Sequence, residues 1–154
     1  MTSIVYRDPS RGVGRLASGI NVTLVEAPYR SARIHLISPL VYVTFEGKRL
    51  VVPAGFVCDG ASIPSALWVR LGHPLAWANA AMGIVHDHGY RMGERPREEV
   101  DMLAWDMALL GGHPDELAAE IHAGVAIWGG AAWEANAQKR AACQGDTARL
   151  LAWV

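Results

Sequence analysis

Apolar and polar residues alternate along the first half of this chain, whereas apolar residues recur every three to four positions along the second half. Between Asn21 and Asp59 the β-branched and aromatic residues follow the two-residue period of strands. A turn signal at 46–48 separates two of these runs, which predicts a hairpin. We therefore expect three to five short antiparallel strands in this region.

After Pro64 the apolar residues follow helical spacing, and Gly and Pro residues mark where each helix ends and the next begins. The predicted helices cover 65–71, 74–92, 96–110 and a last stretch that starts at Pro114. The pair Gly129-Gly130 in that last helix predicts a bend or a close helix contact. The expected fold class is α+β, with a small antiparallel sheet from the N-terminal half packed on a C-terminal bundle of three to four helices.

Two segments lie outside these elements. Residues 1–19 are rich in Gly, Ser and Arg, which predicts an extended N-terminal arm followed by a single α+β domain over 20–154. The last five residues, 150–154, are apolar and must dock on their own domain or on a partner.

Composition narrows the class of protein. The 154 residues are 51% hydrophobic and 19% charged, which is typical of a globular domain, and the net charge of -1 gives no electrostatic reason to expect nucleic-acid binding. No apolar run reaches the roughly 18 residues of a membrane span, and the first residues lack the apolar run of a signal peptide. Whether Cys58 or Cys143 forms a disulfide stays open, because two distant cysteines define no disulfide framework.

The most chemically distinctive stretch contains His86, Asp87 and Tyr90. His86 and Tyr90 are four residues apart and share a helix face, while Asp101 sits at nearly the same height on the next, antiparallel helix, within roughly 3 Å along the axis. Asp101 is therefore expected to accept a hydrogen bond from His86. Such a pair suits general-base catalysis, with His86, Asp101 and Tyr90 as candidate catalytic residues, and it equally suits a buried hydrogen-bond network.

Other polar residues offer further candidates. Asp59 and Ser62, where the chain changes from sheet to helix, are expected either to cap turns or to line a pocket that faces the helices. Asp87 supplies a carboxylate for a divalent cation such as calcium. A zinc site from His86, His88 and His122 is a weaker alternative, because residues two apart on a helix do not face each other.

The segment VPAGFVCDGASIP at 52–64 resembles the signature of DUF1353, a family of unknown function found mainly in bacteriophages and prophages. Val85-His86-Asp87, Tyr90, Arg97 with Asp101, and the segment 121–133 extend the resemblance over roughly residues 35 to 133. The sequence departs from the family pattern at Cys58, where Thr is more usual, and at His122, where an aromatic residue such as Tyr is expected. The resemblance implies a phage-encoded protein, located in the virion or the host cytoplasm.

A second, local resemblance is to secreted phospholipase A2. It rests on a His-Asp pair followed by Tyr on one helix, with an Asp on the antiparallel neighbour. It implies that His86 activates water, Asp87 binds calcium, and Asp101, supported by Tyr90, orients His86. This chain lacks that family's disulfides and its Gly-rich calcium loop.

Two functions follow as expectations. The first is a virion-associated tail or neck component, or an assembly factor, which contacts other phage structural proteins or copies of itself through its six Trp residues and its apolar tail. The second is a small hydrolase that cleaves an ester in lipid or cell-envelope material, using His86 with Asp101.

Overall fold

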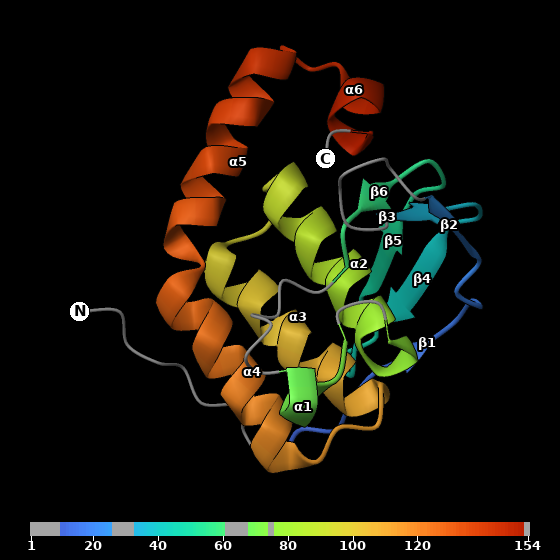
Figure 1. The fold of residues 1–154 in the computed structure, drawn as a ribbon, viewed down its shortest axis with the longest axis vertical. Helices are drawn as coiled ribbons and strands as arrows, with labels where there is room; N and C mark the ends of the chain where they lie inside the picture. Colours follow the sequence, from blue (N-terminus) through green and yellow to red (C-terminus); the bar gives the residue numbers. More distant parts are fainter. Residues whose placement is uncertain (1–9, 26–32, 61–67, 74–75, 153–154) are drawn as a thin grey trace.

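The computed structural model describes residues 10–25, 33–60, 68–73 and 76–152. Strands lie on one side and helices on the other (Figure 1), so the fold class is α+β as the sequence predicted. The strands are β1 Arg15–Leu16, β2 Val22–Val25, β3 Arg33–Leu36, β4 Leu40–Val43, β5 Arg49–Val52 and β6 Val57–Cys58. The helices are α1 Trp68–Leu71, α2 Trp77–Met92, α3 Arg97–Leu110, α4 Asp115–Trp128, α5 Gly130–Cys143 and α6 Thr147–Leu151.

The described strands form two antiparallel sheets rather than the single small sheet expected. One has the order β1-β4-β5 and the other β2-β3-β6. The hairpin between β4 and β5 turns at Gly47, whose positive φ of 82° suits a glycine, and the amide of Thr44 closes the turn by donating to the carbonyl of Lys48. The additional strand is β1, which lies within the segment predicted as an arm and is too short for its alternation to be recognised in the sequence.

The helical half is organised around the antiparallel pair α2 and α3, which packs against the sheets on one side and α4 on the other. Helix α2 ends at Gly93, which adopts a left-handed conformation with a φ of 61°. The predicted bend is at Gly129, where α4 stops and α5 starts, and the two helices follow one another along the left edge of Figure 1. None of the helices in the described ranges is long and apolar enough to cross a membrane.

Both ends of the described chain are attached to the body. Leu150 of α6 is buried, so the described part of the apolar tail packs on its own domain. At the other end, Leu16 pairs with Tyr42 of β4.

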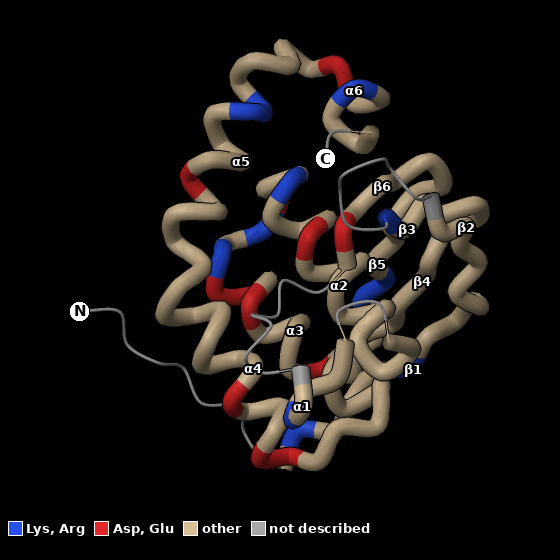
Figure 2. The backbone as a smooth tube through the Cα atoms, in the orientation of Figure 1, with Lys and Arg blue, Asp and Glu red and all other residues tan. Residues whose placement is uncertain are grey.

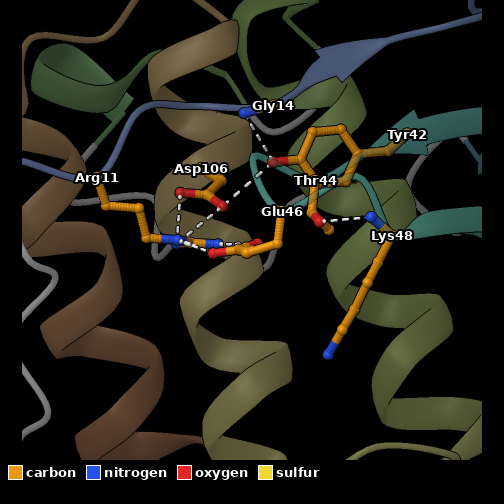
Figure 3. Close-up of polar contacts among 7 residues, drawn as sticks. All are labelled: Arg11, Gly14, Tyr42, Thr44, Glu46, Lys48 and Asp106. Carbon is orange, nitrogen blue, oxygen red and sulfur yellow. Dashed lines mark hydrogen bonds and ion pairs between the residues drawn. The ribbon is translucent and has the colours of Figure 1, made fainter.

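A buried carboxylate on α3 anchors the N-terminal segment (Figure 3). Asp106 is fully buried; it accepts a hydrogen bond from the Tyr42 hydroxyl at 3.2 Å and forms an ion pair with Arg11 at 3.3 Å. Arg11 also contacts Glu46 in the β4–β5 turn at 2.6 Å, and this contact is the main reason why the pKa of Glu46 is lowered to about 2. Burial, followed by the charge of Asp106, raises the pKa of Tyr42, so its hydroxyl stays a donor. One network therefore joins the N-terminal segment, the first sheet and α3.

We expect Arg11→Met to lower the free energy of unfolding by about 2 kcal/mol, because it removes the cation beside a buried carboxylate. Urea denaturation measures the change. The matched control is Arg15→Met, four residues along and exposed, which should change stability by less than about 0.5 kcal/mol. Equal losses in the two variants would contradict this account of the network.

Candidate functional site

The structure brings together His86 and Tyr90 of α2 with Asp101 of α3, as the helical spacing predicted. Nε2 of His86 lies 3.0 Å from Oδ1 of Asp101, and the Tyr90 hydroxyl donates to the same oxygen at 2.6 Å. Asp101 is 3% exposed, so its two donors meet the requirement that a buried carboxylate be hydrogen-bonded. We call His86 and Asp101 the dyad.

Asp101 selects the tautomer of His86. A carboxylate accepts hydrogen bonds, so Nε2 carries the proton, and in the neutral ring Nδ1 then carries the lone pair. Within the described part of the chain Nδ1 makes no hydrogen bond, and the His86 side chain remains 18% exposed. The ring is therefore fixed on one side and available as a base or ligand on the other.

Arg97 supports the dyad from its own helix. Its Nε lies 3.3 Å from Oδ2 of Asp101 and donates to the Tyr90 hydroxyl at 3.2 Å. Its Nη2 donates to the carbonyls of Val125 and Ala126 at 3.0 and 2.7 Å. These carbonyls belong to the last turn of α4, where a cation is favourable. One guanidinium thus compensates the Asp101 charge and fixes α4 against the dyad.

Tyr90 is enclosed by aromatic and backbone groups. Its ring lies 4.3 Å from that of His86 and meets Trp133 of α5 edge-on at 5.1 Å. Gly129 lies beneath the hydroxyl, and a Cβ there would overlap it. Burial, together with the hydrogen bond to Asp101, raises the pKa of Tyr90, so the phenol remains protonated and donating. The absence of a side chain at Gly129 therefore leaves room for the Tyr90 hydroxyl beside Asp101.

His122 of α4 also belongs to this region. It is 3% exposed, and its ring lies 5.0 Å from Trp105 of α3. Burial lowers the pKa of His122, while the charges of Asp101 and His86 act on it in opposite directions, so it lies within electrostatic reach of the dyad. Nε1 of Trp105 is buried without a hydrogen-bond partner among the described residues. These two side chains form the boundary of the site toward α4.

Asp87 points away from the dyad and forms a different contact. Its Oδ2 accepts a hydrogen bond from Nη2 of Arg91 at 2.6 Å. Burial raises the pKa of Asp87, Arg91 opposes that effect, and the nearby charge of Asp59 adds to it. Asp59 is exposed at the end of the last strand, and Ser62 lies outside the described residues. Asp59 therefore lies within electrostatic reach of Asp87.

The metal expectations gain no geometric support. Among the described residues no group of three or more His, Cys, Asp or Glu side chains could hold a metal ion. Calcium usually takes six or more oxygens, whereas Asp87 already has a guanidinium as its partner. Asp87 as a calcium ligand stays a prediction. For the zinc alternative, His88 does not join His86, because its ring packs edge-on against Phe56 at 5.3 Å.

His88 lines a hollow of about 140 Å³ between β5 and α2, on a different side of α2 from the dyad. Burial, followed by the charge of Arg91, lowers the pKa of His88 to about 4. The imidazole is therefore neutral at physiological pH.

Two arginines have structural roles that were not expected from the sequence: Arg97 was noted only as part of the family resemblance, and Arg91 was not singled out. Arg97 could have been found, because it precedes Asp101 by four residues on one helix, a spacing that favours an ion pair. Arg91 is 4% exposed; it donates to the carbonyls of Val57 and Leu151 at 2.7 and 2.9 Å and so attaches α6 to β6. No local pattern announces those long-range contacts.

We expect Arg97→Met to lower the free energy of unfolding by about 3 kcal/mol, because Asp101 then keeps a buried charge without its cation. The control is Arg95→Met, two residues away, whose contact with Glu99 is 3.7 Å long and solvent-exposed. That variant should lose less than about 1 kcal/mol. Chemical denaturation of both variants measures the two changes in the free energy of unfolding. Equal decreases in Arg97→Met and Arg95→Met would show that Arg97 does not support the dyad.

The lowered pKa of His88 predicts a pH dependence of stability. The unfolded chain binds a proton at His88 below a pKa of about 6.5, whereas the folded chain binds it only near 4. The stabilisation is therefore complete above about pH 6.5 and is lost as the pH falls toward 4. Because His88 is partly exposed, the effect is reduced. Between pH 7 and 4.5 the free energy of unfolding of the wild type should fall by about 2 kcal/mol more than that of His88→Gln. Urea unfolding at both pH values measures this, with His35→Gln, an exposed site, expected to behave as wild type.

Comparison with known proteins gives one match. The family model described as "Protein of unknown function (DUF1353)" matches residues 34–125. A search of the curated proteins gave no match, and neither did a search of the solved structures. The matched segment includes both residues of the dyad, Tyr90, Arg97 and His122, and it covers more than half of the chain. By that match the chain belongs to the DUF1353 family.

Proposed function

We propose that this protein is a small hydrolase in which His86 is the general base and Asp101 is the residue that positions it. The observation that carries the proposal is the arrangement of the imidazole: Nε2 lies 3.0 Å from Oδ1 of Asp101, Nδ1 has no hydrogen-bond partner among the described residues, and the His86 side chain is 18% exposed. A histidine arranged in this way is suited to removing a proton from water.

The reaction balances with this one residue as proton carrier. Nδ1 takes a proton from water as the water oxygen bonds to the carbonyl carbon of an ester. The resulting imidazolium is stabilised by Asp101, and it returns the proton to the leaving alkoxide when the carbon–oxygen bond breaks. The products are a carboxylic acid and an alcohol.

The surrounding groups support the same assignment. Arg97 compensates the Asp101 charge, and Tyr90, which stays protonated, donates to Asp101. Together they hold the carboxylate in the position that fixes the His86 tautomer. The aromatic rings of Tyr90 and Trp133 make one side of the site apolar. An ester with an apolar acyl group, from lipid or cell-envelope material, is the substrate class that we propose.

The test is hydrolysis of 4-nitrophenyl esters with acyl chains from acetate to decanoate, followed by absorbance, with phospholipid vesicles as a second substrate. We expect His86→Gln and Asp101→Asn to lower kcat/KM by roughly 100-fold or more, because general-base catalysis contributes about that factor. His35→Gln, which changes an exposed histidine on β3, should keep full activity. Circular dichroism and thermal unfolding establish that each variant is folded.

Three results would count against a hydrolase: no turnover by the wild-type protein on either substrate class, a folded His86→Gln variant with wild-type rates, or equal losses in His35→Gln. Hydrolysis rates measured with added calcium and with EDTA test the role of Asp87 as a calcium ligand. Equal rates under the two conditions would show that Asp87 does not act through calcium, and they would not change the roles proposed for the dyad.

A second candidate, a component of a phage particle such as a tail or neck protein or an assembly factor, is favoured by exposed apolar side chains. Trp128 is 80% exposed, Trp77 is 71% exposed and Val69 is fully exposed. Large apolar side chains of this kind are enriched where proteins bind one another. In this case the dyad only fastens α2 to α3. If particles carrying folded His86→Gln assemble but infect poorly, catalysis is favoured; if they fail to assemble, the structural role is favoured.

A further inference from the structure

Strand β5 lies at the edge of its sheet among the described strands. It pairs with β4 alone among the described strands, in the register Tyr42 with Leu50 and Val43 with Arg49. The amide of Thr44 donates to the carbonyl of Lys48, so in antiparallel alternation Leu50 and Val52 direct their backbone groups toward β4. Arg49 and Val51 therefore direct their N–H and C=O groups away from the sheet, and no backbone hydrogen bond between described residues reaches them.

The hollow of about 140 Å³ runs along this side of β5. Its apolar lining includes Val52, Val85 and Leu103, and its polar lining includes His88, Glu94 and Arg95, together with Arg49 of the strand itself. Pockets for drug-sized ligands usually measure about 300 Å³ or more. This hollow is therefore too small for such a molecule, but it has room for one side chain of a segment laid along β5.

The charges beside the hollow favour a partner with acidic groups. Arg49 is exposed and makes no ion pair with another described residue, and Arg95 reaches only Glu99, at 3.7 Å. Figure 2 shows a basic position on β5, and it shows acidic positions at the start of α4, on α2 and near β6. Arg95 has Glu99 as its ionic partner, so Arg49 is the lining cation that has no ionic partner among the described residues.

We propose that the edge of β5 binds an extended, acidic peptide segment of a partner protein by strand addition. The outward backbone groups of Arg49 and Val51 hydrogen-bond the added strand, the hollow receives one apolar side chain, and an acidic side chain next to it pairs with Arg49. In this mode backbone hydrogen bonds provide affinity and a side-chain pocket provides specificity. No residue of the dyad takes part, so this proposal is independent of the proposed hydrolase activity.

A second copy of the chain fits this edge less well. Two antiparallel β5 strands related by a two-fold axis pair their outward-facing residues, which sets Arg49 opposite Val51 or opposite Arg49 of the other copy. Neither of the two Arg49 side chains would then face a carboxylate. Charge complementarity therefore favours a different, acidic segment.

The test uses an acetylated, amidated heptapeptide of alternating valine and glutamate, titrated into the 15N-labelled full chain. We expect the amide signals of Arg49, Val51 and His88 to shift and saturate together. The same peptide with lysine in place of glutamate should bind at least tenfold more weakly. Val51→Pro should weaken binding at least tenfold, because it removes an outward N–H without affecting the bonds to β4.

Charge reversal provides a variant that leaves the backbone intact. Arg49→Glu should weaken binding of the glutamate peptide at least tenfold and strengthen binding of the lysine peptide. Arg15→Glu, on β1 at the opposite edge of the same sheet, should leave the affinity for both peptides unchanged. The proposal is overturned by shifts that map elsewhere or do not occur, by equal affinity for the two peptides, or by unchanged binding in a folded Val51→Pro variant. Sedimentation that shows dimers abolished by Val51→Pro would assign the edge to a second copy and would likewise overturn it.

Discussion

The buried carboxylate of Asp101 imposes the main constraint on this fold. A charge at 3% exposure is tolerated only with partners, and the chain supplies His86 and Tyr90 from α2 and Arg97 from α3. Arg97 also holds the end of α4 through two carbonyls. Three helices are therefore fixed in mutual register by one ionic group, and any function of His86 depends on that register.

The same physical solution recurs at the two ends of the chain. Asp106, five residues after Asp101 on α3, joins the N-terminal segment through Arg11, and Arg91 joins the C-terminal helix α6 through the carbonyl of Leu151. In each case an arginine of low exposure bridges elements that are distant in sequence. These bridges make the domain depend on a few ionic contacts in addition to its apolar core.

Helix α2 separates two regions with different chemistry. Its His86 side meets α3 in a polar, aromatic site, whereas its His88 side borders β5, whose outward backbone groups make no hydrogen bond with another described residue. A helix presents residues two apart to different sides, so neighbouring histidines serve unrelated environments. The lowered pKa of His88, caused by burial, is therefore a matter of stability rather than of the dyad.

The sequence by itself determined the fold class, the position of α2 and α3, the bend at Gly129 and the meeting of His86, Tyr90 and Asp101. These features follow from periodicity and helical spacing, which act over a few residues or across one short turn. Only the tertiary structure decided that the described strands form two sheets, that Arg91 rather than a metal ion faces Asp87, that Gly129 makes room for the Tyr90 hydroxyl, and that β5 pairs with β4 alone among the described strands. Each of these depends on contacts between residues far apart in the chain, and such contacts leave no periodic trace in the order of the amino acids.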